Sequence, residues 1–256
     1  MRSPEQVLGE LEEDRASREG EIRLIENVIA RSQSDEEQAM LRRSLVLLTY
    51  AHLEGFCKFA LMAYASAINA LRLPCKDASI PLVALTLTKV FAALRDLNSR
   101  HPDFSKIVDD RELHMQARER FFLEHFESIV AEKVEIPDFV VDTKSNLSSV
   151  VLKRNLYQLG LRYPIVAGHA GKIDRLLGMR NAIAHGDKLK TPKETDIREY
   201  LQASFNVMGL VQNEVFDSLR NKIYQRDAGA NLAVALPPIG IFQKAAGYFR
   251  LMRDQS

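Results

Sequence analysis

Apolar residues recur at helical spacing along most of the chain. In residues 4–33 they recur at helical spacing between acidic residues, which predicts a long amphipathic helix. Ser34 and Asp35 then form a helix-start signal, and the next apolar run stops before Pro74. Because this second run is the most apolar part of the chain, we expect its helix to lie at the centre of the fold.

The rest of the chain predicts further helices joined by short loops. Ser145 or Asn146 is suited to cap one of these helices, and Gly160 to end it. The predicted helices cover residues 83–97, 112–132, 146–159, 171–185 and 193–226. Residues 134–141 contain Pro137 and are expected to be extended or a loop. The pattern therefore predicts an all-α protein with one helical domain over residues 1–226. An apolar tail, residues 227–256, is expected to be a strap across the helices or a partner-docking segment.

The composition is that of a globular protein, with 46% hydrophobic and 27% charged residues. This apolar content is too high for a disordered chain, and the glycine content is too low for collagen. The two cysteines form neither a disulfide framework nor a zinc-ligand spacing, and no metal, phosphate-loop or serine-hydrolase motif occurs. We therefore expect no metal or cofactor. Two cysteines without a disulfide framework suit a reducing compartment. The acidic N-terminus does not resemble a signal peptide, and we therefore expect a cytoplasmic protein.

Residues 44–71 are mostly apolar, but a membrane span is not expected there. His52, Glu54 and Lys58 lie near the middle of this run. Each charge at a bilayer centre costs about 2.5–3.5 kcal/mol on the insertion scale. The run is better interpreted as a helix buried in a protein core.

The net charge of +1 is a cancellation between two parts of the chain. Residues 1–37 carry a net charge of −6, and residues 143–198 carry +7. The near-neutral total excludes a polycation that coats nucleic acid through bulk charge. The two charged segments are either ordinary solvated helix faces or, for the basic one, a surface that attracts phosphates.

The heptapeptide RNAIAHG, residues 180–186, is the candidate for chemistry. A guanidinium binds phosphate through paired donors, and an imidazole moves protons near neutral pH, so Arg180 and His185 suit RNA cleavage. The spacing alone is weakly specific, because Arg120 and His125 have the same separation. That second pair lacks the flanking Asn and Gly and is interpreted as structural.

RNAIAHG resembles the R-N-x-x-x-H signature of the HEPN superfamily, whose members are small all-helical domains. LLTYAHLEGFCKFAL, residues 47–61, is similar to the Y-x-H-x-E-G-x-x-K stretch of a prokaryotic HEPN branch, and residues 143–161 are similar to its S-N-L segment. Together these segments extend the resemblance over about residues 35–226. It implies an all-α fold, a HEPN-like antiparallel helical bundle with added helices.

The resemblance also implies a function. Many HEPN domains of bacterial toxin–antitoxin and anti-phage defence systems are metal-independent endoribonucleases that cut single-stranded RNA. Arg180 and His185 correspond to the catalytic pair, and Asn181 to a polar supporting residue. Five helical positions separate Arg180 from His185 by about 140° around the axis, so the two side chains cannot stack. In the family a homodimer joins two such pairs in one cleft. Basic residues near the signature are expected to bind the RNA: Lys172, Arg175, Lys188 and Lys190.

Glu54 and Lys58 are expected to support this site or the packing around it. Four residues apart with Glu first, they suit a buried ion pair that fixes helix packing. Alternatively, Glu54 orients Arg180 or His185, as the family's recurring acidic residue suggests. His52 is expected at the edge of the core.

A different class of function remains open, namely a non-catalytic HEPN module that binds RNA, a nucleotide or a defence protein. An antitoxin or a defence-system protein is the expected partner in either case. HEPN toxins that are silenced by adenylylation carry a tyrosine two residues after the histidine. Here that position is Asp187, so this form of silencing is not expected.

Overall fold

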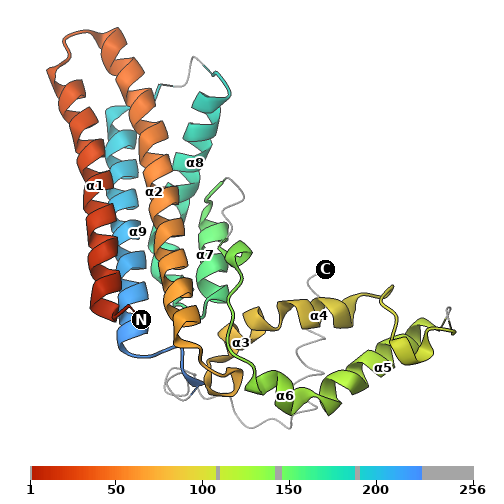
Figure 1. The fold of residues 1–256 in the computed structure, drawn as a ribbon. Coiled ribbons are helices and arrows are strands. Elements are labelled where there is room, and N and C mark those ends of the chain that lie inside the picture. The colour runs from red at the N-terminus through yellow and green to blue at the C-terminus, as the bar shows by residue number, and fades with distance from the viewer. Residues whose placement is uncertain (1, 108–109, 142–145, 188–190, 227–256) are drawn as a thin grey trace.

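A computed structural model describes residues 2–107, 110–141, 146–187 and 191–226. The long helices form an antiparallel bundle in which α1 and α8 run one way and α2 and α9 the other (Figure 1). Their bounds are α1 Pro4–Arg31, α2 Asp35–Leu71, α8 Ala170–Ala184 and α9 Glu194–Arg220, and the shorter α7 is Ser149–Gln158. The described residues contain no β-strand, which confirms the all-α prediction.

Caps fix the ends of α1 and α2 where the sequence predicts them. Ser3 and Gln6 form a capping box, and Ser34 accepts a hydrogen bond from the Glu37 N–H. The second helix ends at Arg72, which has a left-handed backbone (φ 51°). Pro74 follows two residues later, and the expected stop is therefore confirmed.

Helix α2 lies at the centre of the bundle and packs against α1, α8 and α9. Its fully buried side chains include Tyr50, Phe56 and Tyr64. Helix α1 approaches so closely that a Cβ at Gly55 would lie 2.6 Å from Nη1 of Arg18. By length and composition α2 is the one described helix that qualifies as a membrane span, and 50% of that stretch is buried inside the protein. Contact with three neighbouring helices accounts for its apolar character.

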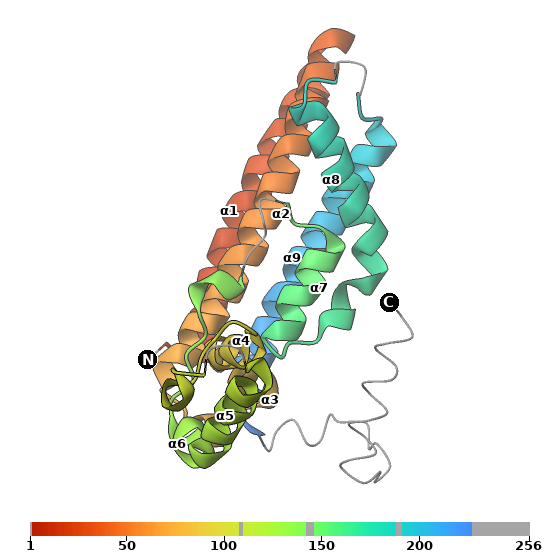
Figure 2. The same cartoon turned by 90° about the vertical axis from the view of Figure 1, so that its right-hand side faces the viewer.

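Residues 75–131 form an arm that projects from one end of the bundle (Figures 1 and 2). It contains η1 Cys75–Asp77, α3 Ile80–Thr86, α4 Thr88–Arg95, η2 Pro102–Phe104, α5 Arg111–Glu124 and α6 Phe126–Ala131.

The two helices predicted for this region are each broken in two, at Leu87 and at His125. The Thr88 hydroxyl donates to the Leu85 carbonyl, and a ring nitrogen of His125 lies 2.9 Å from the Phe121 carbonyl. Such local side-chain contacts compete with the helical ladder, and periodicity alone does not reveal them.

Two further predictions need correction. Helix α9 ends at Arg220 rather than near 226, because Lys222 takes a left-handed backbone (φ 54°). The cap of α7 is Ser148, whose hydroxyl accepts from the Val151 N–H, rather than Asn146. Ser145, the other expected cap, lies outside the described residues.

The segments beside α7 are irregular, as predicted for residues 134–141. They contain the turn η3 Asp138–Val140, and Asn69 of α2 exchanges two hydrogen bonds with Ile136. The 3-10 helix η4 Tyr163–His169, which the sequence did not predict, joins α7 to α8. The predicted tail, residues 227–256, lies outside the described residues.

Candidate functional site

The RNAIAHG segment closes helix α8, as predicted. His185 is the C-cap residue of the helix, and Gly186 follows with a left-handed backbone (φ 85°). The Gly186 N–H donates to the Ile183 carbonyl (3.1 Å), and the Asp187 N–H donates to the Ala182 carbonyl (3.0 Å). This pair of bonds is a Schellman motif, which requires a residue that tolerates positive φ. The glycine of the signature therefore sets where the helix ends and where His185 sits.

Arg180 lies against the bundle. Its guanidinium carbon is 4.7 Å from the centroid of the buried Tyr50 ring, a distance suited to a cation–π contact. The Nη1 group donates to Oδ1 of Asn181 (2.8 Å) and to Oδ1 of Asn146 (3.2 Å). The arginine is thus held by three side chains from three separate parts of the chain.

These contacts bring together the three segments on which the family resemblance rests. Tyr50 comes from α2, Asn146 from the segment before α7, and Arg180 from α8. The Leu147 N–H donates to the Tyr50 hydroxyl, which ties the second segment to the first. Sequence reasoning assigned no role at this site to Tyr50, and it expected Asn146 only as a helix cap, although both belong to the quoted motifs.

Tyr50 stays neutral at physiological pH. Burial, followed by the nearby Glu54 charge, raises the pKa of its hydroxyl to about 12. A neutral hydroxyl accepts the Leu147 N–H and retains its own proton, and the Glu54 charge lies close enough to act on it. The Glu54 charge therefore acts on Tyr50, which in turn supports Arg180.

The expected ion pair between Glu54 and Lys58 is not formed. Glu54 is half-buried beside Tyr50, whereas Lys58 is exposed, and no ion pair joins them among the described residues. An exposed ammonium is well hydrated and needs no buried partner, which removes the reason for the predicted pair.

His52 and Gly55 lie on the other face of the same motif and contact α1. The imidazole of His52 is half-buried, as predicted, with Nε2 3.1 Å from the Glu21 carboxylate and Nδ1 3.5 Å from Arg18. The Y-x-H-x-E-G motif thus has two roles: one face reaches the arginine, and the other docks α1 on α2.

His185 lies away from Arg180. It is exposed at the end of α8, and its side chain makes no hydrogen bond or ion pair with another described residue. Ile173, Leu176 and Ile183 mark the buried face of the helix. Arg180 lies next to this buried face, whereas His185 lies on the opposite side of the helix axis from the face. One chain therefore does not bring the predicted catalytic pair into contact.

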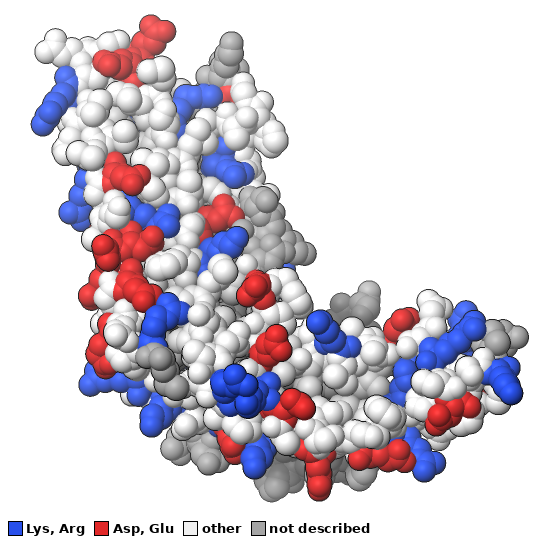
Figure 3. Space-filling view, in the orientation of Figure 1, with Lys and Arg blue, Asp and Glu red and all other residues white. Residues whose placement is uncertain are grey.

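The predicted RNA-binding residues are in different situations. Lys172 is half-buried, and Arg175 is paired with Glu199 of α9 at 2.8 Å. Lys188 and Lys190 lie outside the described residues. Figure 3 shows acidic and basic side chains interspersed over the face that it displays, with acidic groups gathered along α1. Several of these acids pair with arginines of their own helix, for example Glu19 with Arg15.

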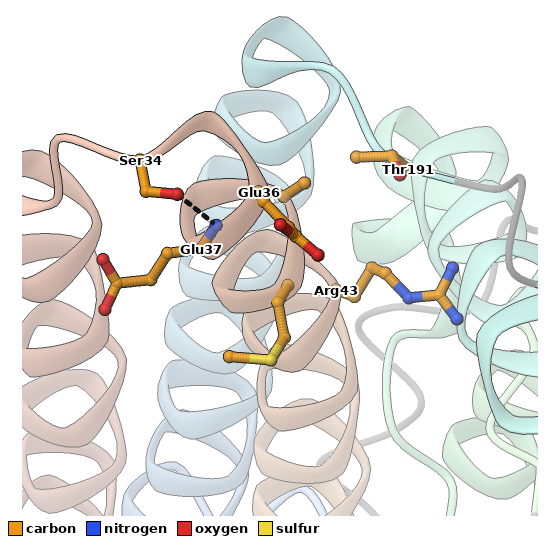
Figure 4. Close-up of a pocket in the computed structure, with 7 residues that line it drawn as sticks. Ser34, Glu36, Glu37, Arg43 and Thr191 are labelled. Atoms are coloured by element: carbon orange, nitrogen blue, oxygen red, sulfur yellow. Dashed lines mark hydrogen bonds between the residues drawn. The ribbon is translucent and has the colours of Figure 1, made fainter.

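A hollow of about 760 Å³ opens at the start of α2, beside the end of the RNAIAHG segment (Figure 4). Arg43 lines it and donates to the Asp187 carbonyl (2.7 Å), two residues after His185. The other lining residues are Ser34, Glu36, Glu37, Ala39, Met40 and Thr191.

Neither the Arg120/His125 pair nor a metal site adds a second candidate for chemistry among the described residues. Arg120 pairs with Glu124 and His125 stacks on Phe121, which is consistent with a structural role for this second Arg/His pair. Among the described residues, no group of three His, Cys, Asp or Glu side chains is placed to hold a metal ion. Both cysteines are free and buried.

The comparison with protein-family models identifies the family of this chain. The model of the MAE_28990-like HEPN family (HEPN_MAE_28990) matches residues 7–224. The chain belongs to this HEPN family. HEPN membership agrees with the all-α bundle and indicates a ribonuclease-like or RNA-related module. No curated protein and no solved structure matches the chain.

Proposed function

We propose that this HEPN protein is a metal-independent endoribonuclease that cleaves single-stranded RNA at a site shared by two chains. The observation that carries the proposal is the way Arg180 is held. Nη1 makes both hydrogen bonds, whereas Nε and Nη2 donate to no described residue. A guanidinium fixed at one end keeps a paired-donor edge, which suits two phosphate oxygens.

The histidine supplies the proton transfers in this proposal. His185 takes the proton of the ribose 2′-hydroxyl as the 2′-oxygen attacks phosphorus. The bond to the 5′-oxygen breaks, and the imidazole of the second chain donates a proton to that oxygen. The products are a 2′,3′-cyclic phosphate and a 5′-hydroxyl. Arg180 stabilises the negative charge that builds on the phosphorane.

Two chains are proposed because Arg180 and His185 face different sides of α8. A second copy that brings its signature helix alongside the first would place its histidine near the arginine of the first chain. The exposure of His185 at the helix end leaves it available for such a cleft.

We extend the proposal to the cellular setting that is usual for bacterial HEPN ribonucleases. The protein acts in the cytoplasm, in a toxin–antitoxin or anti-phage defence system, with an antitoxin or a defence protein as partner. Basic residues of the segment that contains α8 supply part of the RNA affinity.

Cleavage of single-stranded RNA in excess EDTA tests the proposed activity. We expect Arg180→Ala and His185→Ala to lose at least about 10²-fold in rate, the usual loss when an acid–base or charge-stabilising group is removed. Arg120→Ala and His125→Ala are matched controls, because they remove the other Arg/His pair with the same spacing; they should cleave like the wild type. Activity that survives both signature substitutions would overturn the proposal. RNA binding without cleavage would favour the non-catalytic module instead.

A further inference from the structure

The hydrogen bonds of Arg180 fix the orientation of two asparagine amides. Nη1 carries two protons, and these go to Asn146 and Asn181. Because arginine has no acceptor, each amide must turn its oxygen toward the guanidinium. The NH2 group of each amide therefore points away from Arg180. This orientation follows from the donors and acceptors of the three side chains alone.

Asn146 is exposed, so its outward NH2 group is available to a ligand. Its backbone is held on the C-terminal side by bonds of the next two residues. The Leu147 N–H is bound to the Tyr50 hydroxyl, and the Ser148 hydroxyl caps α7. The sequence suits Asn146 for that cap, yet its side chain is engaged with Arg180 instead.

The groups of these three side chains that have no hydrogen-bond partner among the described residues are therefore all donors. They are the Nε and Nη2 edge of Arg180 and the NH2 groups of two amides. Glu54, the nearby carboxylate, is half-buried beside Tyr50. A rim of donors around a guanidinium selects an anion with several oxygens, such as a phosphodiester.

We propose that Asn146 is a further phosphate-binding residue, and that Tyr50 positions it together with Arg180. The Asn146 amide donates to a non-bridging oxygen of the same phosphodiester that Arg180 binds. Tyr50 does not touch the ligand; its ring supports the guanidinium and its hydroxyl holds the Leu147 N–H. The inference rests on the proposed function for the identity of the ligand as RNA.

Binding of a fully 2′-O-methylated single-stranded RNA, followed by fluorescence anisotropy at fixed salt, tests this proposal without cleavage. Asn146→Asp keeps an oxygen for Arg180 but replaces the donor with a negatively charged acceptor. We expect its Kd to rise at least about tenfold, because a hydrogen bond to a charged group is lost. Asn206→Asp is the matched control: it makes the same charge change on the exposed face of α9, and its Kd should stay within about twofold of the wild type.

Two additional variants separate binding from positioning. Asn146→Ala removes the donor without adding charge and should weaken binding by about three- to tenfold. Tyr50→Phe keeps the ring but loses the hydroxyl, and should weaken binding by several fold while Arg180 remains in place. Tyr64→Phe, at another buried tyrosine of α2, controls for the loss of a buried hydroxyl. Circular dichroism confirms that each variant is folded.

The outcomes distinguish this inference from the proposed function. Equal affinities for Asn146→Asp and Asn206→Asp, or no binding by the wild type, would overturn the role of Asn146. Wild-type protein that binds the methylated RNA through Asn146 but cleaves no unmodified RNA would leave this inference standing and would contradict the nuclease.

Discussion

At the scale of single residues, the arginine and the histidine of the signature are positioned in different ways. Arg180 is held by Tyr50, Asn146 and Asn181, whereas His185 is placed only by the helix end. The sequence identified Arg180, Asn181 and His185 because their motif is local. It could not identify Asn146 and Tyr50, because their contacts with Arg180 join positions far apart in the chain.

Gly186 offers a direct test of how the helix end is set. Its positive φ strains any residue with a Cβ, so Gly186→Ala should lower the free energy of unfolding by about 1–2 kcal/mol. Gly178→Ala is the matched control in the same helix. It has no described atom within 4 Å of the added Cβ, and it should raise the free energy of unfolding by about 0.5–1 kcal/mol. Urea unfolding measures both. Equal changes of the same sign would contradict the Schellman assignment.

At the scale of elements, periodicity predicted the long helices well and the arm poorly. Helices α1, α2, α8 and α9 each bury apolar residues along one face, and this face is what periodicity reports. The arm helices α4 and α6 contain no fully buried residue, so their pattern carries little information. Their breaks depend on side chains that bond to nearby carbonyls.

The contact between α1 and α2 should make stability depend on pH. Burial, partly offset by the Glu21 charge and reinforced by Arg18, lowers the pKa of His52 below its usual 6.5, and Asp14 of α1 also acts on it. The unfolded chain then binds the proton more readily. The contribution of neutral His52 to stability is therefore complete above about pH 6.5 and declines as the pH falls toward the folded-state pKa.

Urea unfolding between about pH 5 and about pH 7.5 checks this expectation. His52→Gln keeps the polar contact without titrating, so its free energy of unfolding should fall less than that of the wild type on acidification. The substitution of the exposed His125 by Gln is the control and should leave the wild-type slope unchanged. Identical slopes for the wild type and His52→Gln would contradict the assignment.

At the scale of the whole molecule, the shared site makes a prediction about mixtures. Arg180→Ala and His185→Ala are each expected to be inactive, because every cleft in either homodimer lacks one group. A mixed dimer restores one arginine and one of the two histidines to the shared cleft, so it should recover part of the activity. When the two variants are denatured and refolded together, RNA cleavage should rise above that of either alone. If the mixture is no more active than its components, each chain acts separately or not at all.

The burial pattern of the arm predicts which part of the molecule unfolds first. In its outer helix α5 the buried side chains, His114 and Arg118, are polar and bind backbone carbonyls, while Phe121 and Leu123 are exposed. A helix with so little apolar burial unfolds before the bundle does, so the amides of α5 should exchange with deuterium first. Protease cleavage in the arm would then separate α1 and α2 from α7, α8 and α9 in sequence only. The two fragments would stay joined by the bundle core, with Tyr50 still beneath Arg180.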